Sequence, residues 1–160
     1  MILINIFILF LCESFLSIHL SSAQTLPAQC SNYVPIDDGT RNVNALGSNG
    51  CDTMFIAGTD WIRFIGASGT QIPTSPTNSN RCGTQVTGWY SGSLPSVSNT
   101  INGRICFSFD GDTCKWSNTI AVTNCGSFYV YQLTMPPVCS ARYCAETPVV
   151  PTTVFPSNIF

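Results

Sequence analysis

The cysteines constrain this chain more than any other feature of its sequence. Nine occur among 160 residues, and Cys12 lies in an N-terminal apolar segment. That segment covers residues 1–23 and ends in the small residues Ser21-Ser22-Ala23, which predicts a secretory signal peptide cleaved after Ala23. An uncleaved membrane anchor is the alternative. An even number of cysteines in a secreted chain predicts that all of them are bridged, and those left after cleavage are Cys30, Cys51, Cys82, Cys106, Cys114, Cys125, Cys139 and Cys144.

The pairing of these cysteines is not fixed by their spacing, because eight of them allow about a hundred connectivities. Cys139 can pair with the nearby Cys144 or with a distant partner, and Pro136-Pro137 favours a distant partner for one of the two by directing the chain away from the preceding strand. A zinc site is the alternative use of the thiols. However, the chain contains no Cys-x-x-Cys pair and its single histidine, His19, lies in the predicted signal peptide. We therefore expect no metal and no cofactor.

Four segments have the β-branched and aromatic composition of strands, namely 61–65, 101–109, 119–124 and 128–134. The last two are joined by Cys125-Gly126-Ser127, which predicts a β-hairpin. Residues 71–100 are rich in Pro, Ser, Thr, Asn and Gly, with one apolar island at Val86–Tyr90, and are expected to form a loop. The sequence thus predicts a mainly β fold, a small disulfide-rich antiparallel β domain with long loops.

One domain accounts for the mature chain, from Cys30 to Cys144. Residues 145–160 are rich in Pro and Thr and are expected to form a mobile tail. After cleavage the chain carries six basic and seven acidic side chains, which gives it no electrostatic footprint for nucleic acid or for anionic membranes. No later segment has the length and apolarity of a membrane span. These features predict a secreted, extracellular protein.

The side chains left after cleavage also restrict catalysis. Without a histidine, His-dependent nucleophilic catalysis is excluded. Paired carboxylates could still hydrolyse a glycoside, and the candidate pairs are Asp37-Asp38 and Asp110/Asp112. Both lie in turn sequences without evident burial, and the second pair lacks the later ligands of a calcium loop. We therefore expect no enzyme, and keep a carboxylate hydrolase as the remote alternative.

The aromatic residues indicate a binding function. Trp61 and Trp116 belong to strand patterns and are expected to be mostly buried, whereas Trp89 and Tyr90 lie in the predicted loop beside Gly88 and form the possible contact surface. We expect a secreted, non-catalytic binding module that acts as a monomer on an extracellular protein or glycan. The alternative is a structural constituent of mucus or extracellular matrix. A covalent matrix would need intermolecular disulfides, against which the even cysteine count argues.

An ordered series of motifs resembles the cysteine-rich domain of the uromodulin and pancreatic secretory-granule membrane glycoprotein family, whose members carry eight or ten cysteines. The series runs without interruption from Cys30 to Cys144. Its pieces are Tyr33, Ile36-Asp37-Asp38, Arg41, Cys51-Asp52, Trp61-Ile62-Arg63-Phe64, Gly66, Arg81-Cys82-Gly83-Thr84, Trp89, Gly92, Pro95, Arg104, Cys106, Cys114, Trp116, Cys125, Phe128-Tyr129-Val130-Tyr131, Leu133, Pro137, Cys139 and Tyr143-Cys144.

The resemblance implies an extracellular module related to host defence or adhesion. The chain departs from the family pattern at Pro76 and at Thr113, where relatives often carry two further cysteines. If those two pair in the relatives, their joint absence leaves no unpaired thiol here. The chain also has no Asn-x-Ser/Thr sequon, so a decoy role that depends on N-glycans does not transfer.

Overall fold

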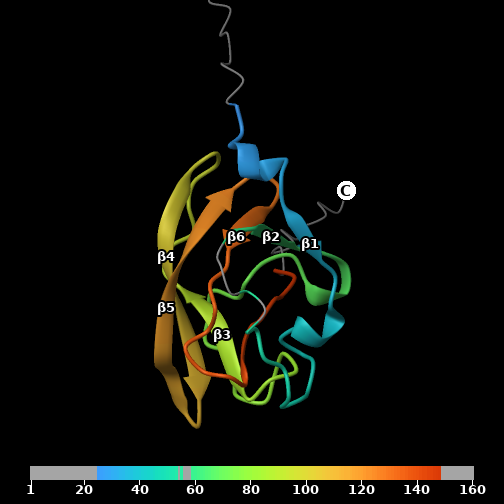
Figure 1. Cartoon of the computed structure of the whole chain (residues 1–160), viewed down its shortest axis with the longest axis vertical. Coiled ribbons are helices and arrows are strands. Elements are labelled where there is room, and N and C mark those ends of the chain that lie inside the picture. The colour runs from blue at the N-terminus through green and yellow to red at the C-terminus, as the bar shows by residue number, and fades with distance from the viewer. Residues whose placement is uncertain (1–24, 54, 56–58, 149–160) are drawn as a thin grey trace, which may run out of the picture.

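The computed structural model describes residues 25–53, 55 and 59–148. The predicted signal peptide and residues 149–160 of the predicted tail lie outside this part of the chain. Within it, seven strands form one sheet and three short 3-10 turns flank them. The strands are β1 (Val34–Ile36), β2 (Trp61–Phe64), β3 (Val86–Ser91), β4 (Thr100–Phe109), β5 (Asp112–Asn124), β6 (Tyr129–Gln132) and β7 (Ala141–Tyr143), and the turns are η2 (Ala28–Cys30), η3 (Gly39–Arg41) and η4 (Gly66–Ser68) (Figure 1).

The sheet has the strand order β1-β2-β6-β5-β4-β3-β7. The predicted mainly β fold is therefore confirmed, and most neighbouring strands pair antiparallel as expected, but the sheet is mixed. β1 pairs with β2 and β3 pairs with β7 in parallel, whereas the strands between them pair antiparallel. Parallel pairing requires long connections between the paired strands. A long loop connects β1 to β2, and β4, β5 and β6 lie between β3 and β7 in the chain.

The β4–β5 hairpin is the longest part of the sheet. Its two-residue turn is Asp110-Gly111, and both residues have positive φ, 51° and 83°, as a type I′ turn requires. Along β5 the burial alternates between exposed and partly or fully buried residues, which is the period-two pattern of a strand with one face on the core. The predicted hairpin around Cys125 is also confirmed, since β5 pairs antiparallel with β6.

The sheet curves so that its two edges approach each other (Figure 1). The edge strands are linked beyond their ends: Asn42 bridges Ala145 in parallel, and Gln71 bridges Glu146 antiparallel. The strands thereby surround one cluster of buried side chains. Its members include Ile62, Phe64, Ile72, Val86, Tyr90, Ile105, Phe107, Ile120, Val122, Tyr131, Leu133 and Tyr143.

The sequence patterns do not predict three of the strands, β1, β3 and β7. The apolar island at 86–90, predicted as loop, belongs to β3, which lies between β4 and β7. Gly88 stands in its middle because a Cβ there would lie 2.9 Å from both the Arg142 carbonyl oxygen and the Phe107 ring. β1 and β7 have three residues each, too few to display a period.

The three disulfides among the described residues join distant segments and close one hairpin. They are Cys30–Cys125, Cys82–Cys144 and Cys106–Cys114. The structure differs from the predicted complete bridging at Cys51 and Cys139, which are free thiols. These two lie within hydrogen-bonding range of each other, and this bond lowers the pKa of Cys51 and raises that of Cys139. The fourth bridge, with a distant partner for Cys139, therefore stays a prediction.

The C-terminal end of the folded part lies slightly beyond Cys144. Ala145 and Glu146, placed in the tail by the sequence, form the bridges to Asn42 and Gln71 described above. No helix of the described residues is both long enough and apolar enough to span a membrane.

Candidate binding surface

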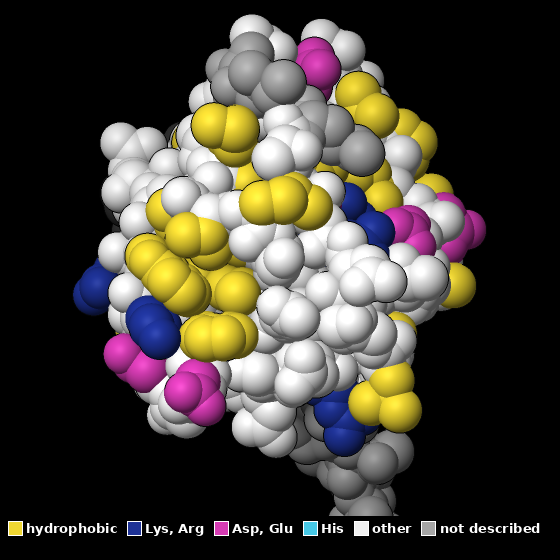
Figure 2. All heavy atoms as spheres, turned by 60° about the horizontal axis from the view of Figure 1, so that its bottom comes forward, with side chains coloured by type: hydrophobic (Ala, Val, Ile, Leu, Met, Phe, Trp, Pro, Cys, Tyr) yellow, Lys and Arg dark blue, Asp and Glu magenta, His cyan; other side chains and the backbone are white. Residues whose placement is uncertain are grey.

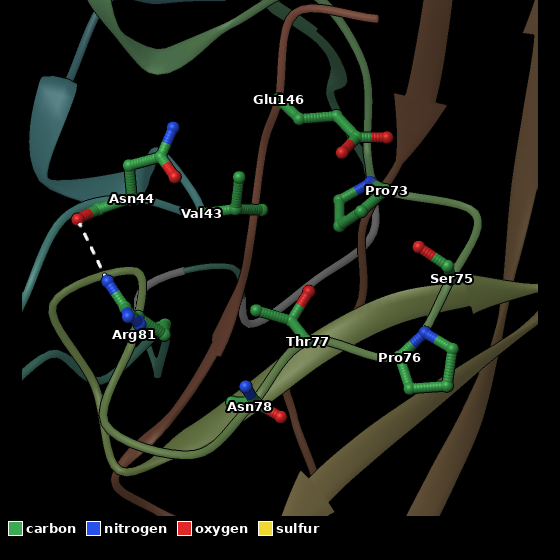
Figure 3. A pocket seen from close by; sticks show the side chains of 9 residues that line it. All are labelled: Val43, Asn44, Pro73, Ser75, Pro76, Thr77, Asn78, Arg81 and Glu146. Carbon is green, nitrogen blue, oxygen red and sulfur yellow. Dashed lines mark hydrogen bonds between the residues drawn. The ribbon is translucent and has the colours of Figure 1, made fainter.

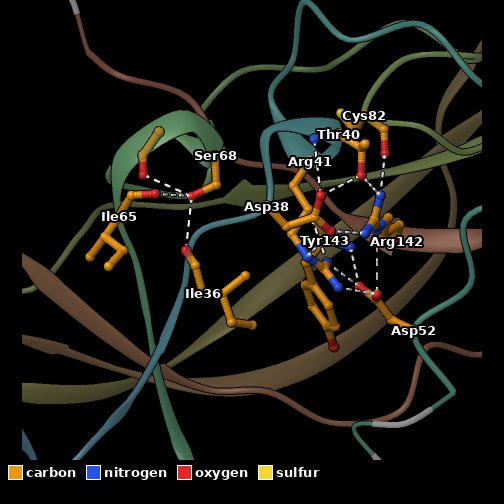
Figure 4. A network of polar contacts seen from close by, with 11 residues as sticks. Ile36, Asp38, Thr40, Arg41, Asp52, Ile65, Ser68, Cys82, Arg142 and Tyr143 are labelled. Carbon is orange, nitrogen blue, oxygen red and sulfur yellow. Dashed lines mark hydrogen bonds and ion pairs between the residues drawn. The ribbon is translucent and has the colours of Figure 1, made fainter.

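A buried ion pair fixes the loop between β1 and β2 to the edge of the sheet. Asp52 accepts two hydrogen bonds from the Arg41 guanidinium, at 2.8 and 2.6 Å, and one from the Tyr143 backbone N–H, at 2.9 Å. The side chains of Arg41 and Asp52 are 4% and 1% exposed, so both charges are buried. Figure 4 shows the pair beside Tyr143 of β7. Arg41 also donates to the Tyr143 carbonyl at 3.3 Å.

A second pair extends this network toward the surface. Asp38 caps η3 through its bonds from the Thr40 N–H and hydroxyl, and it also accepts a hydrogen bond from Arg142. Burial pushes the pKa of Asp38 upward, but the Thr40 hydrogen bonds and the charges of Arg142 and Arg41 outweigh it and hold that pKa below its usual value. The sequence places Asp38 in a turn, which is right, but its carboxylate is ion-paired rather than freely solvated.

The two candidate carboxylate pairs remain in separate parts of the fold. Asp37 is exposed and accepts a hydrogen bond from the Ala67 N–H at 2.7 Å, while Asp110 lies in the β4–β5 turn and Asp112 begins β5. Asp38 is held ionised between two guanidinium groups, so it is a poor proton donor at neutral pH. Within the described residues no group of three or more His, Cys, Asp or Glu side chains is placed to hold a metal ion.

Trp89 and Tyr90, the predicted contact surface, are neighbours on β3 and point to opposite faces of the sheet. Trp89 is half-buried and its indole N–H donates to the Thr113 carbonyl at 2.7 Å. Tyr90 is 1% exposed and belongs to the core, so its assignment to a contact surface is wrong. The physical reason is that neighbouring residues of a strand point to opposite faces, and the segment was not recognised as a strand. Trp61 and Trp116, expected to be mostly buried, are partly buried and pack against core clusters.

A different group of side chains forms the best candidate for binding. We call Tyr33, Trp61, Arg63 and Phe128 the Arg63 cluster; all four are half-buried. The Arg63 guanidinium carbon lies 3.7 Å from the centroid of the Phe128 ring and 5.4 Å from that of Tyr33. Its Nη1 donates to the Tyr33 hydroxyl at 2.7 Å, and the two rings pack edge to face. Arg63 is therefore held in place by stacking and by one hydrogen bond.

No acidic side chain in the described part of the chain forms an ion pair with Arg63. The four ion pairs of the described residues involve only Arg41 and Arg142 as cations, with Asp38 and Asp52. The Nε of Arg63 is buried without a hydrogen-bond partner. The cluster rests on a buried base of Val130 and the Cys30–Cys125 disulfide, which fixes it to the sheet. A positioned guanidinium framed by aromatic rings is suited to accept an acidic group.

A second aromatic group lies beside the turn of the β4–β5 hairpin. Figure 2 turns the bottom of Figure 1 forward and shows hydrophobic side chains gathered there beside basic and acidic ones. Near this turn Phe109 and Trp116 pack with their ring centroids 6.0 Å apart. The Lys115 ammonium lies over both rings, at 4.8 and 5.3 Å from their centroids. Lys115 thus covers the rings that a partner would contact, which makes this group the weaker candidate.

The sequence alone does not single out the Arg63 cluster as a binding surface. The alternation of β2 places Trp61 and Arg63 on one face. Tyr33 and Phe128 lie about thirty residues before and sixty residues after them in the chain, and only the pairing of β1, β2 and β6 brings all four together. That Arg63 has no carboxylate beside it, within the described residues, follows only from how the chain folds.

Known proteins resemble this chain over most of its length. A family model of the uromodulin-like cysteine-rich domain matches residues 62–145. The pancreatic secretory granule membrane major glycoprotein GP2 of Rattus norvegicus is 33% identical over 137 residues, which is 82% of this chain and 25% of the relative. GP2 of Canis lupus familiaris is 34% identical over 120 residues, 73% of this chain and 23% of the relative. Uromodulin of Mus musculus is 34% identical over 119 residues, 73% of this chain and 18% of the relative.

The chain spans a quarter or less of the length of these curated relatives. What they share with it is the cysteine-rich domain, including all the strands of the sheet from the second residue of β2 onward. The chain belongs to the uromodulin-like domain family.

Proposed function

We propose that this protein is a secreted, non-catalytic binding module, acting as a monomer, whose Arg63 cluster contacts an acidic side chain of an extracellular protein. The observation that carries the proposal is the Arg63 guanidinium, stacked on Phe128 and fixed by Tyr33 without an ion-pair partner in the described part of the chain. The predicted signal peptide and the disulfides support an extracellular location.

The composition of the cluster supports a protein partner. Trp, Tyr and Arg are the residues most enriched among those that dominate the binding energy of protein interfaces. An acidic side chain that reaches Arg63 forms a charge-assisted hydrogen bond at a site already partly desolvated by Phe128. A role in host defence or adhesion, implied by the resemblance to the family, is the setting we propose for this contact.

The alternative functions lack an observation of this kind. A covalent matrix constituent would need thiols that pair between chains, and the two free thiols lie next to each other. A carboxylate hydrolase would need a protonated acid facing a second carboxylate, whereas Asp38 is ion-paired and its neighbour Asp37 binds a backbone N–H.

A binding array tests the proposal. The secreted chain would be applied to immobilised extracellular proteins and to a glycan array, together with an Arg63→Ala variant and an Arg104→Ala control. Arg104 is exposed on β4, outside the cluster. We expect at least one protein to bind the wild type and the control with equal affinity and the Arg63→Ala variant at least about tenfold more weakly. Unchanged binding by Arg63→Ala, or binding to glycans alone, would overturn the proposal.

A further inference from the structure

A hollow on the surface lies apart from the Arg63 cluster. It has a volume of about 280 Å³ and is formed by three segments: the chain after η3 at Asn44, the loop from Pro73 to Arg81, and Glu146 after β7. Figure 3 shows Arg81 and Glu146 on opposite sides of it, with Pro73, Pro76 and Asn78 along the loop. The volume is near the lower end of the range for small-molecule sites, which suits a ligand of one ring.

The walls of this hollow are held in place by hydrogen bonds to backbone carbonyl groups. The Pro73 carbonyl accepts from the Tyr90 N–H at 2.8 Å, and the Thr77 carbonyl accepts from the Thr87 hydroxyl at 2.7 Å. On the opposite side the Glu146 N–H donates to the Gln71 carbonyl at 2.8 Å. The disulfide of Cys82 to Cys144 joins the ends of the two walls. The hollow is therefore formed before any ligand arrives, which lowers the entropy cost of binding.

The two charges in the hollow have no ionic partner among the described residues. Arg81 donates only to the Asn44 carbonyl, through a long hydrogen bond of 3.4 Å, and neither Arg81 nor Glu146 takes part in an ion pair. Their charges sum to zero, so the hollow has no net charge that would favour a simple anion or a simple cation. A carboxylate, a guanidinium and the Asn78 amide instead match a ligand whose groups both donate and accept hydrogen bonds.

We propose that this hollow binds one neutral hexose-sized sugar residue of an extracellular glycan. Glu146 accepts from a ring hydroxyl, Arg81 donates to another, and Asn78 bonds a third, while the exposed ring of Pro76 packs against the C–H face of the pyranose. A free α-amino acid fits less well, because its two charges are separated by a single carbon and would leave the amide and hydroxyl groups without partners.

Saturation-transfer NMR on the secreted chain tests this site with the methyl glycosides of glucose, mannose, galactose, fucose and N-acetylglucosamine. We expect at least one glycoside to give a saturable signal. Glu146→Gln should weaken its binding about three- to tenfold, because the hydrogen bond from the sugar hydroxyl is no longer charge-assisted, and Asn78→Ala should weaken it about three- to tenfold, because the amide hydrogen bond is lost. Arg104→Gln, a change on β4 outside the hollow, should leave binding unchanged.

The variants must keep the dispersed amide spectrum of the wild type, so that loss of binding is distinguished from loss of folding. No saturable signal from any glycoside, or a signal that Glu146→Gln and Asn78→Ala leave unchanged, would overturn the proposal. Glycine or another free amino acid displacing the glycoside would overturn the assignment of ligand class. The proposal does not depend on the Arg63 cluster, and an Arg63→Ala variant should bind the glycoside like the wild type.

Discussion

The buried carboxylate of Asp52 offers the sharpest test of how this fold is held together. Replacing Asp52 with alanine removes both hydrogen bonds to Arg41 and the one from the Tyr143 N–H. Arg41 stays buried, with the Tyr143 carbonyl at 3.3 Å and the Asp38 carboxylate at 3.7 Å as its remaining partners. The substitution therefore leaves the Arg41 guanidinium in the interior without its two hydrogen bonds and its ion pair to Asp52.

The expected loss of stability is large for a domain of this size. Removing one partner of a buried ion pair costs about 3–5 kcal/mol, because the other charge is left desolvated. The whole free energy of unfolding of such a domain is about 5–15 kcal/mol. At about 4 °C for each kcal/mol, the melting temperature should fall by about 12–20 °C. The parallel pair β3–β7 should loosen first, since Asp52 binds the backbone of β7 directly.

Thermal and urea unfolding with the disulfides intact would measure this loss. Asp60→Ala, the same change at an exposed carboxylate, is the matched control and should stay within about 0.5 kcal/mol of the wild type. The double variant Arg41→Met with Asp52→Leu should be more stable than Asp52→Ala, because no unpaired charge remains. A loss below about 1 kcal/mol for Asp52→Ala, or a double variant no better than the single one, would refute the reasoning.

Three further predictions concern packing, pH and the free thiols. Gly88→Ala should destabilise the domain by about 1–3 kcal/mol because its Cβ meets rigid neighbours at 2.9 Å, whereas Gly92→Ala, with its nearest neighbour at 3.5 Å, should be nearly neutral in thermal unfolding. Because the folded state lowers the pKa of Asp38, the stability advantage of the wild type over Asp38→Asn should be complete above about pH 4 and shrink as the pH falls further; an advantage that grows on acidification would contradict this. Under denaturing, non-reducing conditions the secreted protein should contain no free thiols, since Cys51 and Cys139 are adjacent in an oxidising compartment; finding two would rule out the fourth bridge.

The sequence predicts the strands that have a long periodic pattern and misses those that depend on their surroundings. In β4 apolar and polar residues alternate from Ile101 to Phe109, and the predicted strand 101–109 matches it closely. Of β5 only the second half is predicted, as 119–124, because its first half has fewer β-branched residues. β3 looks like a loop because Gly88 interrupts its apolar run. That glycine is required by the close approach of β7 and the Phe107 ring, which no local window contains. The parallel pairs join segments far apart in the chain and leave no local signal.

For the candidate binding surface, too, one part follows from the strand pattern in the sequence and the rest depends on the fold. The face shared by Trp61 and Arg63 follows from the strand period alone. Arg63 stacks on Phe128 and has no ion-pair partner among the residues that the structure describes, whereas Arg41 and Arg142 are paired; this difference depends on which loops meet in three dimensions. Only the fold separates the two ion-paired arginines, Arg41 and Arg142, from Arg63.

The measurement that tests the proposed binding surface most directly is a residue-resolved NMR titration of the ¹⁵N-labelled secreted chain with a short acidic peptide and, separately, with sialyllactose. The account predicts saturable shifts of the Arg63 Nε–H and the Trp61 indole N–H on addition of the peptide, with no comparable shift at Arg104. Shifts that grow linearly without saturation, that are equal at Arg63 and Arg104, or that appear with sialyllactose alone would contradict it.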